Sequence, residues 1–373
     1  MSFGRLAGAT SEFVFFIVFK LKSEIINISL DSDVLEDDIM NLSEALLRQL
    51  LVDQSRKLSC GKEGNLEADS NIFWATDIYE ERYGKGNGFD YNDPITLESI
   101  TGKNAYVIQP RMRKSLEEQV KRSREKGEVF TPSWLCNKQI NSVDETWFGH
   151  GNVFNKELDN QDGTHEWVPF EGSITFPEGK ANRTWQDYVM DVRLEITCGE
   201  APYLVSRYDT ISGQFIPISH RIGMLDRKLR VVCENCDDEE SWLSFAKRAY
   251  QSIYGYDWQG DNVLIARESL LISFLEYYKF KFGNIPSIAI LLEISDIISW
   301  NIWQMDGLKC VVPDSCHDSI IDEPGSLFKD MVTKTTKQCE GCSKNKLSLH
   351  NGIKCYVKDW KTNELVLFSS LVK

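Results

Sequence analysis

The clearest absence in this sequence is that of a long apolar run. The chain has 373 residues, and its longest purely apolar run, Phe13–Phe19, covers only seven of them. A membrane-spanning helix needs about 20 apolar residues, so we expect no membrane span. The N-terminal residues also lack a basic segment followed by a long apolar stretch and a small-residue cleavage site, the pattern of an export signal. These absences predict a cytoplasmic protein.

Proline, cysteine and histidine are also scarce. Only 10 prolines, with 42% hydrophobic and 26% charged residues, indicate an ordinary folded protein. Ten cysteines are too few for a disulfide scaffold in a chain of this length, so we expect free thiols and at most one metal site. The sequence contains five histidines and no Gly-x-Ser-x-Gly, His-Glu-x-x-His or phosphate-loop motif. These absences argue against the common hydrolases and nucleoside triphosphatases.

Excess positive charge is missing as well. The net charge is −14, which argues against nucleic-acid binding through bulk electrostatics. One block, residues 103–126, is nevertheless basic. Its cations either form a solvated helix face paired with nearby acids or contact phosphates, and the sequence favours neither reading. The cations are Lys103, Arg111, Arg113, Lys114, Lys121, Arg122, Arg124 and Lys126.

The first half of the chain shows one clear element. Apolar residues recur at helical spacing between Leu35 and Leu51, so we predict a small helical layer there. Residues 61–100 are rich in turn-forming residues, which favours a boundary near residue 100. Residues 137–185 show no periodicity and suggest loops with short strands.

The second half alternates strand and helix patterns. Residues 191–197 and 253–256 are predicted strands, and Asp261–Phe282 is the best predicted helix, followed by an apolar segment at Ile288–Trp303. This succession is typical of a doubly wound α/β sheet with ligand loops at the carboxyl ends of its strands. An α+β fold without a parallel sheet is the alternative. We divide the chain into residues 1–100, an α/β domain at 101–335 and a small module at 336–373.

Four short motifs in these elements suit ligand binding. The loop in LEITCGEAPYLV, residues 194–205, lets a ligand approach the backbone. Asp257 ends a strand, where a carboxylate can accept ribose hydroxyls, although it can also be a helix N-terminal charge. Asp306 suits an adenine amino group or the cap of a turn. Residues 130–132, Phe-Thr-Pro, precede a predicted helix, which proline after threonine often starts.

Taken in order, these motifs resemble those of the adenine-specific DNA methyltransferases of restriction–modification systems. The shared order is a Phe-Thr-Pro loop, a strand with a glycine-containing loop, a Gly-x-acid strand before an Ala-Arg-x-x-Leu-Leu helix, and a later Asp-Gly-Leu. The stretches LEITCGEAPYLVSRYDT, RIGMLDRKLRVV and IISWNIWQMDGLK look most like bacterial modification subunits. The resemblance covers roughly residues 125–310. It implies a Rossmann-like methyltransferase sheet with an N-terminal helical region and a small C-terminal appendage.

The resemblance also implies a cofactor, partners and roles for single residues. S-adenosylmethionine would be the cofactor, double-stranded DNA the substrate, and a second restriction–modification subunit the protein partner. The activity would be methylation of the amino nitrogen of an adenine flipped out of the duplex. Thr131 and Pro132 would line the methionine end of the cofactor, Asp257 would hold its ribose and Asp306 its adenine. The strand end and loop at its amino-acid portion would be Glu195, Cys198, Gly199 and Ala201.

Two departures from the family pattern bear on activity. The loop has one glycine, Gly199, where the family usually has more, and Glu200 follows it. The catalytic Asn/Asp/Ser-Pro-Pro-aromatic tetrapeptide is absent, because the chain contains no Pro-Pro pair. Either another chain or an unusual loop supplies the catalytic element, or the fold is catalytically degenerate and binds DNA or a partner. A methyltransferase acting on RNA or protein is a third reading.

The C-terminal segment carries a possible zinc site. Cys339 and Cys342 form a Cys-x2-Cys pair that is followed by His350 and Cys355, enough donors for a four-coordinate structural zinc ion. Other donors lie close by and leave the ligand set open. They are Cys310, Cys316, His317 and the pair Cys233 and Cys236. Surface thiols in a hairpin are the alternative.

Overall fold

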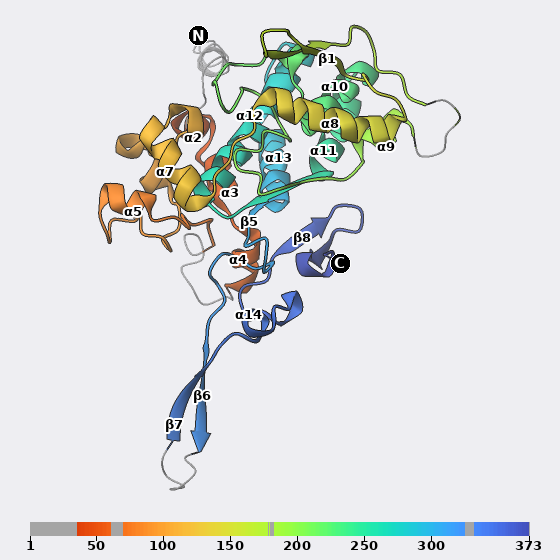
Figure 1. Ribbon diagram of the computed structural model, residues 1–373. Coiled ribbons are helices and arrows are strands. Elements are labelled where there is room, and N and C mark those ends of the chain that lie inside the picture. Colours follow the sequence, from red (N-terminus) through yellow and green to blue (C-terminus); the bar gives the residue numbers. More distant parts are fainter. Residues whose placement is uncertain (1–35, 61–69, 178, 180–182, 325–331, 373) are drawn as a thin grey trace, which may run out of the picture.

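The computed structural model (Figure 1) describes residues 36–60, 70–177, 179, 183–324 and 332–372. The apolar run Phe13–Phe19 lies outside these residues. Among the helices in the described ranges, none is both long and apolar enough to cross a membrane.

A three-stranded parallel sheet lies at the centre of the second half. Strands β3 (Arg193–Ile196), β4 (Ile253–Asp257) and β5 (Ile302–Gln304) pair in that order. Leu194 lies opposite Tyr254, and Tyr256 lies opposite Trp303. The predicted α/β class with a parallel sheet is thus confirmed, and the α+β alternative without such a sheet is wrong. The finer expectation of a Rossmann-like methyltransferase sheet stays a prediction.

Helices pack against one face of this sheet (Figure 1). Helix α12 (Gly260–Phe282) confirms the predicted helix, and it ends at Gly283, whose φ of 73° is left-handed. All of its residues from Gly260 to Tyr278 are buried, so it is a central helix rather than one with a single apolar stripe. Around it lie α10 (Met224–Asn235), α11 (Glu239–Gln251) and α13 (Ile288–Asn301).

The predicted N-terminal helical layer consists of two helices, α2 (Glu36–Leu42) and α3 (Glu44–Leu51). Helix α3 packs on α13 and α12 through its buried leucines, so this layer belongs to the main core. Shorter helices follow along the chain. They are α4 (Gln54–Ser59), α5 (Ile78–Tyr83), α6 (Leu97–Ile100) and α7 (Leu116–Lys126).

Half of the cations of the basic block, Lys114, Lys121, Arg122 and Lys126, have carboxylate partners within the protein. Lys121 pairs with Glu81, and Lys126 with Asp77, at 2.5 Å in the second pair. Arg122 is fully buried and its guanidinium lies 2.6 Å from carboxylate oxygens of both Glu128 and Asp261. These pairs favour the ion-pairing alternative for part of the block, while Lys103, Arg113 and Arg124 are exposed.

The expectation of loops across residues 137–185 is wrong in its first part. Helix α8 (Ser133–Phe148) fills it, followed by the antiparallel hairpin β1 (Asn155–Asp159) and β2 (His165–Pro169), and then α9 (Trp185–Val189). The helix buries polar side chains because Arg227 binds them: its guanidinium lies 2.6 Å from Asp144 Oδ2 and 2.8 Å from Asn137 Oδ1. Because its buried side chains are partly polar, this helix shows no apolar periodicity in the sequence.

The C-terminal part contains two antiparallel hairpins. The first, β6 (Ser319–Pro324) and β7 (Val332–Lys337), projects from the body of the molecule (Figure 1). The second, β8 (Tyr356–Asp359) and β9 (Glu364–Leu367), lies beside the sheet, and Phe368 after it packs with Tyr256 and Trp303. Between the hairpins lies the short helix α14 (Glu340–Lys344).

Candidate functional site

The carboxyl ends of the three parallel strands meet at one edge of the sheet. Just past β3, the amide of Cys198 donates to the Tyr256 carbonyl at 2.8 Å, and that of Gly199 donates to Asp257 Oδ2 at 3.0 Å. The amide of Met305 donates to the Asp257 carbonyl at 2.9 Å. Cys198, Asp257 and Asp306, which immediately follows Met305, therefore lie at the same edge, as the strand–loop succession predicts.

The loop after β3 is tightly wound. Thr197, Gly199 and Ala201 have φ angles of 48°, 54° and 61°, a left-handed conformation that costs about 1–2 kcal/mol for a residue with a side chain. Such strain gathers at functional positions. A Cβ on Gly199 would lie 3.9 Å from the ring of Phe130, so the Phe-Thr-Pro loop packs directly over this glycine.

Thr131 and Pro132 hold that loop in place through their backbone. The Thr131 carbonyl accepts from Thr210 Oγ1 at 3.0 Å and from Cys136 Sγ at 3.6 Å. Pro132 is the N-cap residue of α8. The loop is thereby fixed between α8 and the insert around Thr210, beside the wound loop of β3.

The Asp257 carboxylate is buried and already has partners. Besides the Gly199 amide, it accepts from the Gln259 amide at 3.0 Å and from Asn262 Nδ2 at 3.4 Å. Burial raises the pKa of Asp257 to about 6, although the amides of Gln259 and Gly199 act in the opposite direction. A ribose hydroxyl would have to share this carboxylate with the bonds that join the two loops.

Two glutamates flank the loop. Glu195 is buried, which raises its pKa, and its Oε2 has no hydrogen-bond partner among the described residues. Glu200 accepts from the Arg111 amide at 2.5 Å and from the Tyr208 hydroxyl at 2.8 Å. The Glu200 carboxylate is therefore already hydrogen-bonded within the chain, and a bound cofactor would not have to displace these bonds.

Asp306 caps its own turn. Its Oδ1 accepts from the amides of Leu308 and Lys309 at 2.9 and 3.1 Å, and its Oδ2 lies 3.1 Å from Lys309 Nζ. This is the turn-capping role that the sequence left open.

A separate groove of about 800 Å³ lies on the face of the sheet that carries Leu194, Tyr254 and Trp303. None of the eight predicted cofactor residues lines this groove.

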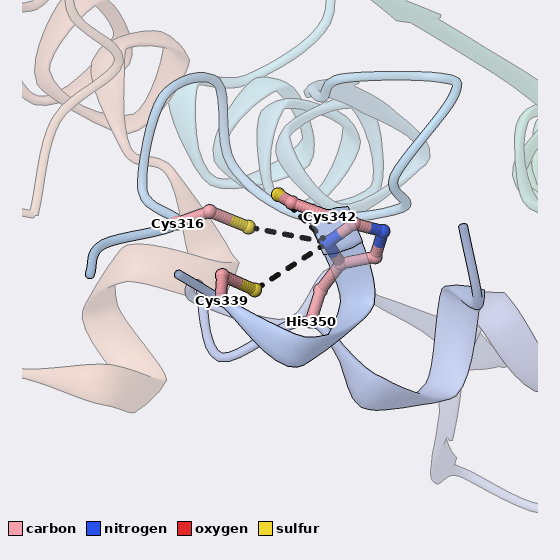
Figure 2. A group of neighbouring side chains, drawn as sticks. All are labelled: Cys316, Cys339, Cys342 and His350. Atoms are coloured by element: carbon pink, nitrogen blue, oxygen red, sulfur yellow. Dashed lines mark hydrogen bonds between the residues drawn. The ribbon is translucent and has the colours of Figure 1, made fainter. Parts of the chain in front are cut away.

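A second cluster lies at the base of the projecting hairpin (Figure 2). The imidazole Nδ1 of His350 lies 3.4 Å from the sulfur of Cys316, 3.6 Å from that of Cys342 and 3.8 Å from that of Cys339. The four ligand atoms all lie within 4.8 Å of one another. In a tetrahedral zinc site with bonds of about 2.3 Å to sulfur and 2.0–2.1 Å to nitrogen, each sulfur lies about 3.6 Å from the nitrogen. The cluster can therefore hold a metal ion of this kind.

Local sequence explains how the four side chains meet. Cys316 precedes β6 and Cys339 follows β7, so the hairpin returns the chain to its starting point. Gly341 allows His350 to approach, because a Cβ there would lie 2.4 Å from the His350 amide nitrogen and 2.6 Å from its Cγ. Asn351 and His317 join the loops by two hydrogen bonds, of 2.6 and 3.2 Å.

The observed ligand set differs from the predicted one by one residue. Cys339, Cys342 and His350 meet as predicted, but Cys316 takes the place of Cys355. Cys355 is fully buried in a core cluster with Tyr256 and Trp303, because it leads into β8 beneath the sheet. The ligand set therefore includes residues from both sides of the domain boundary predicted at residue 336.

The thiol of Cys339 has a lowered pKa. Burial opposes its ionisation, but hydrogen bonds from the amides of Asn351 and Cys342 lower the pKa to about 6.

Comparisons with known proteins add no relatives. No protein-family model, no curated protein and no solved structure matches this chain. The methyltransferase resemblance stays a prediction from the residues themselves, and the geometry described above is what bears on it.

Proposed function

We propose that this chain is a methyltransferase-like subunit of a restriction–modification system that binds S-adenosylmethionine and acts on adenine in DNA. The hydrogen bond between the Gly199 amide and the Asp257 carboxylate carries the proposal. It joins the loops at the carboxyl ends of two adjacent parallel strands, the place where α/β sheets bind nucleotide-like ligands. The Phe130 ring over Gly199 supports the same assignment.

The residues at this edge fit the cofactor in kind. The wound backbone of residues 197–201 would take the amino-acid portion beside Glu195, with Thr131 and Pro132 near the methionine end. Asp257 would accept the ribose hydroxyls and Asp306 the adenine amino group. When bound, S-adenosylmethionine supplies an electrophilic methyl group for the target nitrogen. The chain's own residues would orient the cofactor, and Phe130 would shield the loop from water.

A second candidate is a catalytically degenerate subunit that binds DNA or a protein partner. A specific observation favours it: the carboxylates of Asp257 and Asp306 already have partners within the chain. The absence of a Pro-Pro pair points the same way. In this case the sheet would be a scaffold.

We also propose that the cysteine–histidine cluster binds Zn²⁺ in a structural role. Three sulfurs and one imidazole nitrogen occupy all four tetrahedral positions and leave none for water or substrate. The ion would tie the start and the end of the β6–β7 hairpin to the loop that carries His350.

A transfer assay separates the two candidate functions. S-adenosylmethionine with a labelled methyl group is incubated with mixed-sequence DNA and the chain, with and without the product of the neighbouring gene. Label that enters DNA adenine supports the methyltransferase, and a need for the second protein shows that it supplies the missing catalytic element. Cofactor binding without transfer in either mixture favours the scaffold. Asp257→Ala is the matched variant and should abolish transfer.

A further inference from the structure

The face of the parallel sheet opposite the helices is covered only in part. On this face, the Phe368 ring that follows β9 packs against Trp303 of β5, with ring centroids 5.2 Å apart. The Tyr254 hydroxyl of β4 donates to the Lys358 carbonyl of β8 at 3.2 Å. On β3, Leu194 lies beside Tyr254 and is 43% exposed. Parallel sheets normally have both faces covered, but the described chain covers β4 and β5 here and leaves β3 open.

The open part of this face borders the groove of about 800 Å³. Val192, Leu194 and Tyr254 line the groove along the sheet, and residues of the β8–β9 hairpin and of the segment after it line it as well. Sites for small molecules are typically clefts of about 300–1,000 Å³, lined mainly by apolar and aromatic side chains with a few charged groups. The groove has the volume and the lining of such a site.

The charged side chains of the groove are mostly cations. Arg248 lies in the last turn of α11, and Lys358 and Lys361 belong to β8 and the turn after it. None of the three forms an ion pair with a carboxylate of the described chain. Neutral groups contact them instead. Arg248 Nη1 lies 3.7 Å from the sulfur of Met190, and Lys358 Nζ lies 4.4 Å from the ring centroid of Trp360.

Asp359 is the one acidic residue among the described residues that line the groove. Its Oδ1 accepts from the amides of Lys361 and Thr362 at 2.8 and 3.4 Å, and the first of these bonds is the main reason why its pKa is lowered. Three cations and one acid leave the rim of the groove positive, in a chain whose net charge is −14. The groove therefore complements a ligand that is both apolar and anionic.

We propose that this groove binds a small amphipathic carboxylate, a molecule with one carboxylate and an extended apolar body. The body would lie against Val192, Leu194 and Tyr254, and the carboxylate would pair with the cations of the rim. An arginine suits this role because its guanidinium matches the two oxygens of a carboxylate. None of the eight predicted cofactor residues lines the groove, so this site goes beyond the proposed function and does not depend on the binding of S-adenosylmethionine.

Isothermal titration of the full-length chain with decanoate tests the proposal. Decylammonium is the matched probe, with the same chain length and the opposite charge. Decanoate should bind at one site per chain, and decylammonium should bind about tenfold more weakly. No binding of decanoate, or equal affinity for the two probes, would overturn the proposal. Sedimentation of the chain with phosphatidylglycerol vesicles, without binding of decanoate, would assign the face to a lipid surface and would overturn it too.

A pair of double variants tests the role of the cations. R248E/K361E reverses two exposed charges of the rim, so it should bind decanoate about tenfold more weakly and decylammonium more tightly than the wild type. K138E/K156E makes the same change in net charge at exposed lysines outside the groove, and it should leave both affinities unchanged. Circular dichroism shows whether each variant is folded. Equal effects of the two double variants would mean that only net charge matters, against the proposal.

A single variant tests the apolar part of the groove. Leu194→Ser removes apolar surface without changing the charge, so it should weaken decanoate binding by about 3- to 10-fold. Leu308→Ser, at a side chain that is 88% exposed outside the groove, is the control and should bind decanoate as the wild type does. Decanoate affinity that is unchanged in both Leu194→Ser and R248E/K361E would place the ligand elsewhere and overturn the proposal.

Discussion

The metal cluster and the carboxyl edge of the sheet present their polar groups in opposite ways. At the cluster, three sulfurs face one imidazole nitrogen at 3.4–3.8 Å, close to the spacing around a tetrahedral ion. At the sheet edge, the Asp257 carboxylate accepts from the Gly199 amide of the neighbouring loop, and the Asp306 carboxylate accepts from the Leu308 amide of its own loop. The cluster is arranged for a ligand from outside, while the sheet edge must give up internal bonds to take one.

The largest expected effect is on zinc affinity, and it distinguishes the observed ligand set, with Cys316, from the predicted one, with Cys355. Cys316→Ser should lower zinc affinity by on the order of 100-fold or more, since a hydroxyl replaces a thiolate ligand. Cys355→Ser, at a buried thiol outside the cluster, should leave one zinc ion per chain. Competition with a colorimetric chelator gives the affinities. Loss of zinc in Cys355→Ser but not in Cys316→Ser would reverse the assignment.

The next effect tests how closely the cluster is built. Gly341→Ala places a methyl group 2.4–2.6 Å from His350 atoms, so His350 must move. We expect a loss of about 1–3 kcal/mol in folding stability and weaker zinc binding. Gly151→Ala is the control, because its nearest contact would be an ordinary 3.7 Å to Glu145. Thermal unfolding of both variants is measured in the presence of zinc. Equal melting temperatures for Gly341→Ala and Gly151→Ala would contradict the packing argument.

The sheet edge should respond to pH instead. The pKa of Asp257 is about 6 in the folded chain, against 3.8 for an ordinary aspartate. The raised pKa contributes stability below pH 4 that is lost as the pH rises through 6, by about 2–4 kcal/mol. Asp257→Asn removes this pH dependence. Urea unfolding at pH 4.5 and 7 should therefore show that the free energy of unfolding of the variant rises relative to that of the wild type as the pH rises. An unchanged difference between the two proteins would contradict the raised pKa.

The smallest effect concerns the turn at Asp306. Asp306→Ala removes a cap on two amides and should cost about 1 kcal/mol. The same urea measurements at pH 7 detect it. A cost indistinguishable from zero would mean that the cap contributes nothing to the fold.

The spacing of apolar residues predicted that β3 and α12 exist, but not which of their residues are buried. In β3, Leu194 is 43% exposed while Arg193 and Glu195 are buried, and in α12 every residue from Gly260 to Tyr278 is buried. Helix α8 was missed because Asn137 and Asp144 are buried against Arg227, some 80–90 residues away along the chain.

The same limit applies to the candidate sites. Cys339, Cys342 and His350 lie close in sequence and were predicted together, whereas Cys316 joins them only because the β6–β7 hairpin closes. The basic block was ambiguous because its partners Glu81 and Asp77 lie on and beside α5. Contacts made by tertiary folding leave no spacing signal in the sequence.

The most direct test of the proposed function is calorimetric titration of the full-length chain with S-adenosylmethionine at pH 7.5, where Asp257 is ionised. The account predicts binding by the wild type and its loss in Asp257→Ala, with circular dichroism confirming that the variant is folded. No detectable heat for the wild type, or equal affinity in the variant, would contradict the claim that the strand ends hold an adenosyl ligand.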